Sequence, residues 1–97
     1  MRSRFLVCYD IANPKRLRAV FRKMLGFGDP IQYSVFKCDL SPAEKVLLVE
    51  ALHEIVNLRE DRVMIVRLGL VDDDNREQVE FLGTPLTTWQ THRTVII

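Results

Sequence analysis

The chain has 97 residues, of which 47% are hydrophobic and 28% are charged. This length supports one hydrophobic core and excludes two independently folded domains, and the composition is that of a globular protein rather than a disordered one. The formal net charge of +1 hides an asymmetry, because residues 1–25 carry seven Lys or Arg against a single acidic residue, Asp10.

No apolar run approaches the roughly 18 residues that a membrane-spanning helix needs. The N-terminal residues lead directly into a strand pattern and contain no apolar region typical of a signal peptide. We therefore expect a cytoplasmic protein that has no membrane partner.

The first predicted strand runs from Arg4 to Ile11 and is apolar on both faces. Asn13 and Pro14 then provide a helix N-cap and a proline at the first helical position, so a helix is expected to follow. Gly26 is its expected stop. The apolar residues of this helix recur at helical spacing and predict one buried stripe: Leu17, Val20, Phe21, Met24 and Leu25.

The middle of the chain predicts a turn, one strand and a second helix. Residues 28–30 are typical of a turn, and Ile31–Phe36 alternates as a strand. The pattern leaves open whether Lys37–Leu40 continues that strand or forms another. A capping box at Ser41–Glu44 predicts the start of the second helix, whose buried side is expected to contain Leu48, Leu52 and Ile55.

The last third of the chain predicts two further strands. Val63–Leu68 is strongly apolar and is expected to end at Gly69, and a polar loop at Asp72–Glu77 separates it from a short strand at Val79–Leu82. Residues 83–85 are expected to end that strand. The chain closes with Thr94–Ile97, a β-branched apolar stretch.

This order predicts an α+β, ferredoxin-like βαββαβ fold, with two helices on one face of an antiparallel sheet and an extra C-terminal strand. We expect one domain over residues 1–97, made of a core at 1–85 and a tail at 86–97. Two helices can cover only one sheet face, yet both faces of the first strand are apolar. A homodimer whose helix-free faces meet around a two-fold axis would cover the second face.

Asp10 is the candidate catalytic and metal-binding residue. It follows Leu6 and Cys8 in period two, so it should point to the helix-free face, where a second Asp10 would lie nearby in a dimer. Paired carboxylates suit Mg²⁺, which would polarise a phosphodiester and activate a water molecule. The alternative is that Asp10 only caps the turn into the first helix.

A basic stripe on the first helix is the candidate nucleic-acid-binding surface. Lys15, Arg18 and Arg22 lie opposite the apolar stripe, with Arg16 and Lys23 beside them and no acidic residue among them. Such a stripe favours contact with the DNA or RNA backbone, and a merely solvated helix face is the alternative.

Together, several short motifs resemble a known family. The chain is similar to the small CRISPR-associated nuclease of the spacer-acquisition machinery, the shorter of the two nearly universal adaptation proteins. The resemblance covers residues 1–85. The motifs that carry it are Tyr9-Asp10-Ile11, the basic helix starting at Lys15-Arg16, Gln32–Phe36, Ser41–Glu44 and Phe81–Pro85.

The resemblance implies a symmetric dimer with a Mg²⁺ site between two copies of Asp10. It also implies endonuclease activity on single-stranded RNA or double-stranded DNA and a bridging role beside the adaptation integrase. By motif position, the implied site residues are Tyr9, Arg16, Ser34 and Phe36. A noncatalytic DNA-binding scaffold and a toxin-like ribonuclease of the same fold remain alternatives.

The C-terminal strands are the candidate docking element for the integrase. A free apolar edge invites aggregation unless another strand covers it, and adding Thr94–Ile97 to a partner's edge would do so. The alternative is that this tail folds back on its own sheet.

Overall fold

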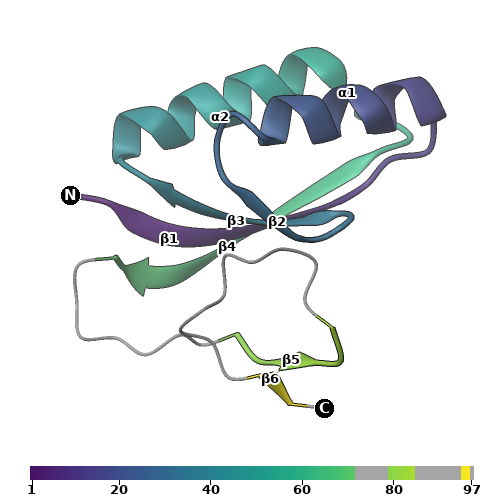
Figure 1. Cartoon of the computed structure of the whole chain (residues 1–97). Helices are drawn as coiled ribbons and strands as arrows, with labels where there is room; N and C mark the ends of the chain where they lie inside the picture. Colours follow the sequence, from purple (N-terminus) through teal and green to yellow (C-terminus); the bar gives the residue numbers. More distant parts are fainter. Residues whose placement is uncertain (72–78, 85–94, 97) are drawn as a thin grey trace.

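The computed structural model describes residues 1–71, 79–84 and 95–96. Its main sheet has four strands in the order β2-β3-β1-β4, all antiparallel to their neighbours. Both helices cover the same face of this sheet (Figure 1), which confirms the predicted βαββαβ arrangement. The elements are β1 (Ser3–Asp10), α1 (Pro14–Met24), β2 (Asp29–Gln32), β3 (Val35–Leu40), α2 (Pro42–Ile55) and β4 (Arg62–Leu70).

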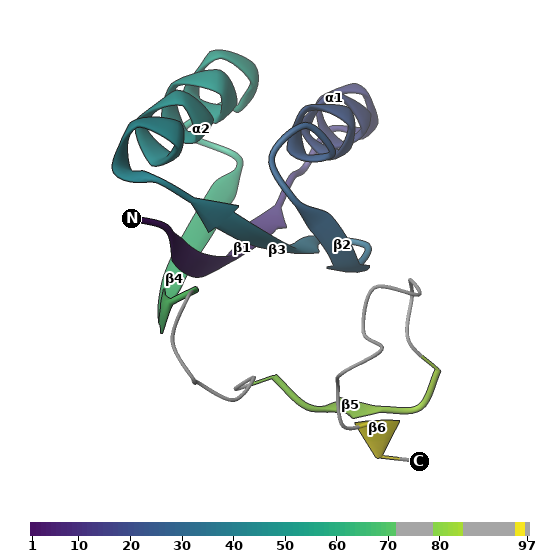
Figure 2. The same ribbon diagram turned by 60° about the vertical axis from the view of Figure 1, so that its left-hand side comes forward.

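Two further strands, β5 (Phe81–Leu82) and β6 (Val95–Ile96), pair in parallel and form a separate small sheet. Figures 1 and 2 show this sheet on the side of the main sheet that the helices leave bare. Val95 and Ile96 therefore pair with β5 of their own chain, and pairing of Thr94–Ile97 with a partner's edge stays a prediction. The loop predicted at residues 72–77 and most of the tail lie outside the described residues.

The prediction of a single strand at Ile31–Phe36 is wrong. Two strands, β2 and β3, occupy this region, and a turn at Tyr33 and Ser34 joins them. Gln32 pairs with Val35, and the two residues between them form the turn. Lys37–Leu40 then continues β3. No non-glycine residue in the described part of the chain has a positive φ. Neither Tyr33 nor Ser34 is a Gly or Asn, so the turn lacks the signals by which tight hairpins are usually recognised in a sequence.

The predicted turn at residues 28–30 is also wrong, because Asp29 already begins β2. Gly28 is needed for close packing: a Cβ atom there would collide with the backbone oxygen of Lys37 and the Sγ atom of Cys38. Pro30 is compatible with β2 because β2 is an edge strand, where a missing N–H costs least.

Both helix starts form as predicted. The side chain of Asn13 accepts hydrogen bonds from the backbone N–H groups of Lys15 and Arg16, at 2.8 and 3.0 Å. The Ser41 N–H donates to the Glu44 carboxylate at 2.8 Å, and the Glu44 N–H donates to Ser41 Oγ at 3.1 Å. These bonds satisfy N–H groups that a helix leaves without internal partners.

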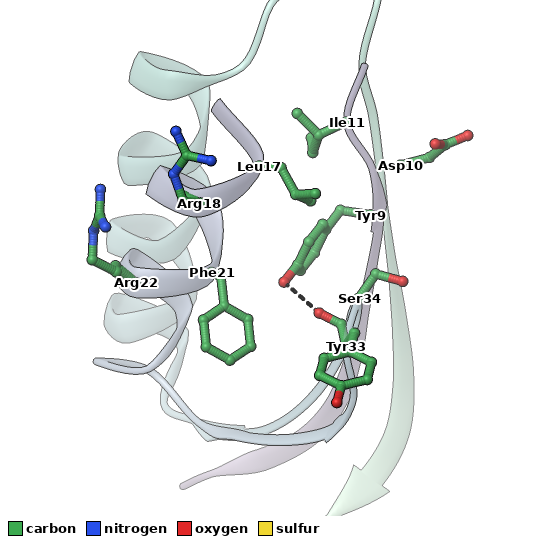
Figure 3. A pocket seen from close by; sticks show the side chains of 9 residues that line it. All are labelled: Tyr9, Asp10, Ile11, Leu17, Arg18, Phe21, Arg22, Tyr33 and Ser34. Atoms are coloured by element: carbon green, nitrogen blue, oxygen red, sulfur yellow. Dashed lines mark hydrogen bonds between the residues drawn. The ribbon is translucent and has the colours of Figure 1, made fainter. Parts of the chain in front are cut away.

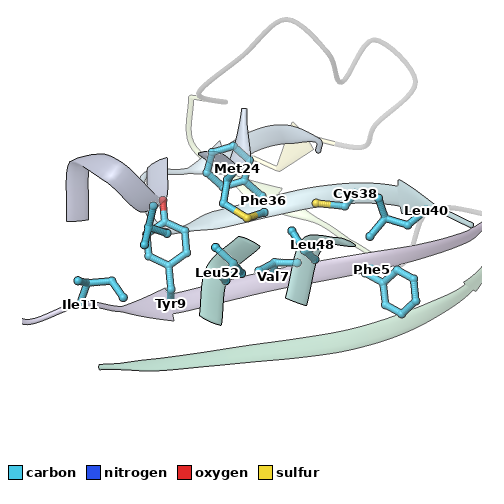
Figure 4. Packing of buried hydrophobic residues seen from close by; sticks show 11 residues of the cluster. Phe5, Val7, Tyr9, Ile11, Met24, Phe36, Cys38, Leu40, Leu48 and Leu52 are labelled. Atoms are coloured by element: carbon cyan, nitrogen blue, oxygen red, sulfur yellow. The ribbon is translucent and has the colours of Figure 1, made fainter. Parts of the chain in front are cut away.

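The core lies between the helices and β1 and β3 (Figure 4). Leu17 in α1 and Leu25 just after it were expected to be buried, but they are 40% and 51% exposed. Leu25 follows the last helical residue, and Leu17 faces an open pocket. The buried cluster contains Phe5, Val7, Tyr9, Ile11, Val20, Met24, Phe36, Cys38, Leu40, Leu48 and Leu52.

Strand β4 runs past the predicted end at Gly69 to Leu70. Its pairing with β1 shifts between Arg4 and Phe5, which oppose Gly69 and Arg67, so Leu68 is the extra residue of a bulge. Gly69 has a φ of 143°, which suits this irregular point.

Candidate functional site

Asp10 lies at the end of β1 on the helix-free face, as predicted. The residues of β1 alternate, with Val7 and Tyr9 buried toward the helices and Cys8 half-buried on the other side. Figure 3 shows the Asp10 carboxylate leaving the sheet on the side away from α1. The Asp10 side chain is 78% exposed. Arg62 lies opposite it on β4, and the distance from Arg62 Nε to Asp10 Oδ2 is 3.9 Å.

The alternative role of Asp10, as a cap of the turn into α1, is wrong. Asn13 accepts from the first helical N–H groups, and the Ala12 N–H donates to Asp61 at 2.9 Å. The Asp10 carboxylate is therefore not used by the turn that follows it.

A single chain does not form a complete metal site around Asp10 within the residues that the structure describes. In the described ranges, no three His, Cys, Asp or Glu side chains gather where they could hold a metal ion. Mg²⁺ is commonly bound by one or two carboxylates together with water and phosphate oxygens. One exposed carboxylate fits that pattern, and a second copy of Asp10 would complete a two-carboxylate site.

Apolar side chains continue from Asp10 along the helix-free face. Cys8 lies opposite Met64 on β4 and Val35 on β3, and Leu6 lies opposite Val66 on β4 and the buried Lys37 on β3. Met64 is 58% exposed and Val66 is 37% exposed in the single chain. An exposed apolar sheet face of this kind is typical of an interface.

The side chains of Lys15, Arg18 and Arg22 are exposed on α1. Among the described residues, none of these three side chains makes a hydrogen bond or an ion pair. Their charges are therefore available to an anionic ligand. Figure 3 shows the guanidinium groups of Arg18 and Arg22 on the outer side of the helix.

Arg16 differs from these three residues because acidic side chains offset its charge. The expectation of an uncompensated basic helix is therefore wrong at Arg16. Its Nε and Nη2 atoms donate to Asp61 at 2.8 and 3.1 Å, and Nη2 also donates to Glu60 at 3.0 Å. The side chain of Asp61 is fully buried, and it also accepts from the Ala12 and Asn57 N–H groups. Arg16 thus ties the start of α1 to the turn before β4.

These contacts keep Asp61 ionised. The Arg16 hydrogen bond, with help from the two backbone N–H groups, holds the pKa of Asp61 well below its usual range. Sequence reasoning missed Asp61, because nothing in its spacing from Arg16 in the chain indicates that the two residues meet.

The N-terminal arginines are also paired. Arg2 donates to both carboxylate oxygens of Glu44, at 2.6 and 3.0 Å. Arg4 donates to those of Asp39, at 2.8 and 3.1 Å. Their positive charges are offset within the chain, so they add little to the basic surface of α1.

Tyr9 and Phe36 are buried on the helix side of the sheet, whereas the Ser34 side chain points to the same side as the Asp10 carboxylate (Figure 3). The Tyr9 hydroxyl donates to the Tyr33 carbonyl oxygen at 3.0 Å, and the Tyr9 N–H donates to the Ser34 carbonyl oxygen at 3.0 Å. Phe36 is fully buried, with its ring 6.2 Å from that of Tyr9 and 5.4 Å from that of Phe21. These residues hold the β2–β3 turn against β1.

Burial raises the pKa of Tyr9 to about 12, so its hydroxyl stays protonated at neutral pH. In this form the Tyr9 hydroxyl donates its hydrogen bond to the β2–β3 turn.

Comparisons with known proteins found similar sequences. Residues 1–76 match the family model described as CRISPR associated protein Cas2. The chain is 35% identical over 92 residues to a protein of Rhodospirillum rubrum named CRISPR-associated endoribonuclease Cas2 1, covering 95% of this chain and 89% of that protein. It is 44% identical over 69 residues to CRISPR-associated endoribonuclease Cas2 of Geobacter sulfurreducens, covering 71% and 73%.

Solved structures show the same fold. Streptococcus pyogenes Cas2 superposes with a TM-score of 0.64 at 35% identity, over 68% of this chain and 86% of that one. A hypothetical protein from Thermus thermophilus gives a TM-score of 0.76 at 25% identity, over 88% and 95%. Within residues 1–71, 79–84 and 95–96, neither helix has the length and apolarity that crossing a bilayer requires.

Proposed function

Because the chain belongs to the Cas2 family of CRISPR-associated proteins, we propose that it is a homodimeric, Mg²⁺-dependent endonuclease that cleaves phosphodiester bonds of RNA or DNA. The observation that carries the proposal is the position of Asp10, an exposed carboxylate beside an apolar sheet face. The names of the relatives, which call them endoribonucleases, support the same reaction.

The dimer is the assembly in which this site becomes complete. Pairing of the helix-free faces covers Met64 and Val66 and brings two Asp10 carboxylates into one region. The two carboxylates would hold Mg²⁺, which would stabilise negative charge on the phosphodiester and make a water molecule more acidic. The protein's own part is to hold Asp10 at the strand end, where the Arg16–Asp61 pair fixes the turn that follows.

The basic side chains of α1 hold the substrate backbone in this proposal. Lys15, Arg18 and Arg22 are unpaired within the described residues and can each neutralise a phosphate. Arg16 supports the site by positioning the turn rather than by binding phosphate, because two carboxylates already surround it.

A second function, a noncatalytic bridge that holds the adaptation integrase on DNA, is favoured by a different observation. The Asp10 carboxylate and the guanidinium groups of Arg18 and Arg22 stand on opposite sides of the sheet (Figure 3). A duplex bound along α1 of one chain therefore need not approach that chain's Asp10. In this reading, the tail at residues 86–97 docks the integrase.

Cleavage of RNA and DNA panels with and without Mg²⁺ distinguishes the two functions. The wild type should cleave only with Mg²⁺, Asp10→Ala should abolish cleavage, and Asp29→Ala, at another exposed acidic residue, should retain it. Nucleic-acid and integrase binding without cleavage would establish the bridging role instead. Cleavage of RNA by a protein that does not bind the integrase would favour the toxin-like ribonuclease.

A further inference from the structure

An open pocket of about 660 Å³ lies between α1 and the β2–β3 turn (Figure 3). Leu17 and Phe21 point from the helix toward the Tyr9 ring, and Tyr33 stands at the lower end. The volume falls within the roughly 300–1,000 Å³ that is usual for small-ligand pockets. Its lining includes Asp10, Arg18 and Arg22 of the site described above, but the proposed functions assign no role to its apolar walls, which are formed by Leu17, Phe21 and Tyr33.

Apolar and aromatic groups at this pocket remain in contact with water. Tyr33 is 80% exposed and Leu17 is 40% exposed. The Tyr9 hydroxyl holds the Tyr33 backbone in place through its 3.0 Å bond. The exposed ring is therefore carried by a fixed turn, which favours a flat apolar ligand that can stack on it.

Two basic residues also line this pocket, with their guanidinium groups on the outer side of α1 (Figure 3). Arg18 and Arg22 are among its lining residues, one helical turn apart, and neither side chain has an acidic partner in the described part of the chain. A ligand that fits both features has a flat aromatic part and an anionic part. A nucleotide has this combination.

We propose that this pocket binds one unpaired base of a nucleic-acid strand, while the phosphates next to that base contact Arg18 and Arg22. A base inside a duplex is stacked on both sides and cannot enter, so the pocket distinguishes unpaired from paired nucleotides. The inference rests on the proposed nucleic-acid-binding function. It assigns a role to Tyr33, which sequence reasoning had placed within a strand.

Binding without divalent metal tests the pocket separately from cleavage. The probes are a short single-stranded oligonucleotide carrying 2-aminopurine and the matched duplex, each titrated with the chain of 97 residues. Tyr33→Ala should weaken single-strand binding about tenfold, since stacking on an aromatic ring is typically worth that much per base. Tyr33→Phe should retain the affinity and the stacking-dependent change in 2-aminopurine fluorescence.

Two sets of controls separate the possible failures. Leu47→Ala, at an exposed apolar residue on α2, should change neither affinity. Duplex binding should change less than twofold in Tyr33→Ala but should fall when Arg18 and Arg22 are both replaced by Ala.

Equal affinities of wild type and Tyr33→Ala for the single strand would overturn the base pocket, while weaker binding by the arginine variant would leave the proposed function standing. No binding of either probe by wild type would overturn both. If Leu17→Ser weakened integrase binding and left oligonucleotide binding unchanged, the pocket would belong to a protein side chain and the proposal would be wrong.

Discussion

The guanidinium of Arg16 donates to both carboxylate oxygens of Asp61, from Nε at 2.8 Å and from Nη2 at 3.1 Å. Because Asp61 also accepts from the Ala12 N–H, this pair fixes the turn that connects Asp10 to α1. One basic residue of the helix therefore has a structural task, whereas Lys15, Arg18 and Arg22 have no partner among the described residues and are available to bind phosphate.

Salt dependence of duplex binding distinguishes these two kinds of basic residue. Replacing Lys15, Arg18 and Arg22 together by Ala should reduce the log–log slope by about 0.9 for each phosphate that the protein no longer neutralises. Arg16→Ala should leave the slope unchanged and lower the melting temperature, because it leaves Asp61 buried without its cation. A double variant at exposed Arg59 and Arg67 is the control. An unchanged slope in the triple variant would assign those charges to solvent.

Acid unfolding reports the Asp61 interactions. Its pKa is lowered in the folded chain, so its stabilising effect is complete above its unfolded pKa of about 4 and is lost as the pH falls below that value. Asp61→Asn should therefore destabilise the protein more at pH 7 than at pH 3 in urea titrations. Exposed Asp29→Asn is the control. A stability difference that stayed constant between the two pH values would contradict this role.

The general arrangement could be predicted from the sequence, because local signals agree with the tertiary structure. Asn13, Ser41 and Glu44 cap the helices as their types and positions indicate, and the period-two pattern of β1 places Asp10 on the correct face. The partners of Arg16 could not be predicted, since Asp61 is brought near only by packing of α1 beside the α2–β4 turn. Charge counting along the helix therefore overstated its free positive charge.

The dimer prediction depends on the helix-free face. Met64→Glu places a charge on that face and should convert the wild-type dimer to single chains in sedimentation experiments at micromolar concentration. Leu47→Glu is a matched control, because Leu47 on α2 is 56% exposed and Met64 is 58% exposed. A monomeric wild type, or a Met64→Glu protein that stayed dimeric, would show that another surface or none is used.

Gly28 tests the packing of the hairpin. A Cβ atom at this position meets backbone and sulfur atoms of β3, so Gly28→Ala should cost about 1–3 kcal/mol of unfolding free energy. Gly26→Ala should cost less, because its nearest contact is the Lys23 carbonyl oxygen at 3.3 Å. Urea denaturation of both variants measures the difference. Equal stabilities would mean that β3 can move away from residue 28 without cost.

The pocket beside α1, like the contact between Arg16 and Asp61, could not be predicted from the sequence. Leu17 fits the apolar period of its helix, and Tyr33 fits the alternation of a strand, so each pattern predicted burial or pairing. The two-residue turn at Tyr33 and Ser34 contains no glycine. Hydrogen bonds from Tyr9 hold this turn, and they cannot be recognised from the sequence. Periodicity predicts which face a residue occupies, but it does not show where a face remains open.

Mixed dimers test the shared Asp10 site most directly. Wild-type and Asp10→Ala chains are combined at known ratios, allowed to exchange subunits, and assayed for Mg²⁺-dependent cleavage. If both carboxylates of a symmetric dimer are needed, an equal mixture should retain about a quarter of the wild-type activity, because only that share of dimers carries two copies of Asp10. Retention of half the activity would show that each Asp10 works alone and would contradict a site shared between the two chains.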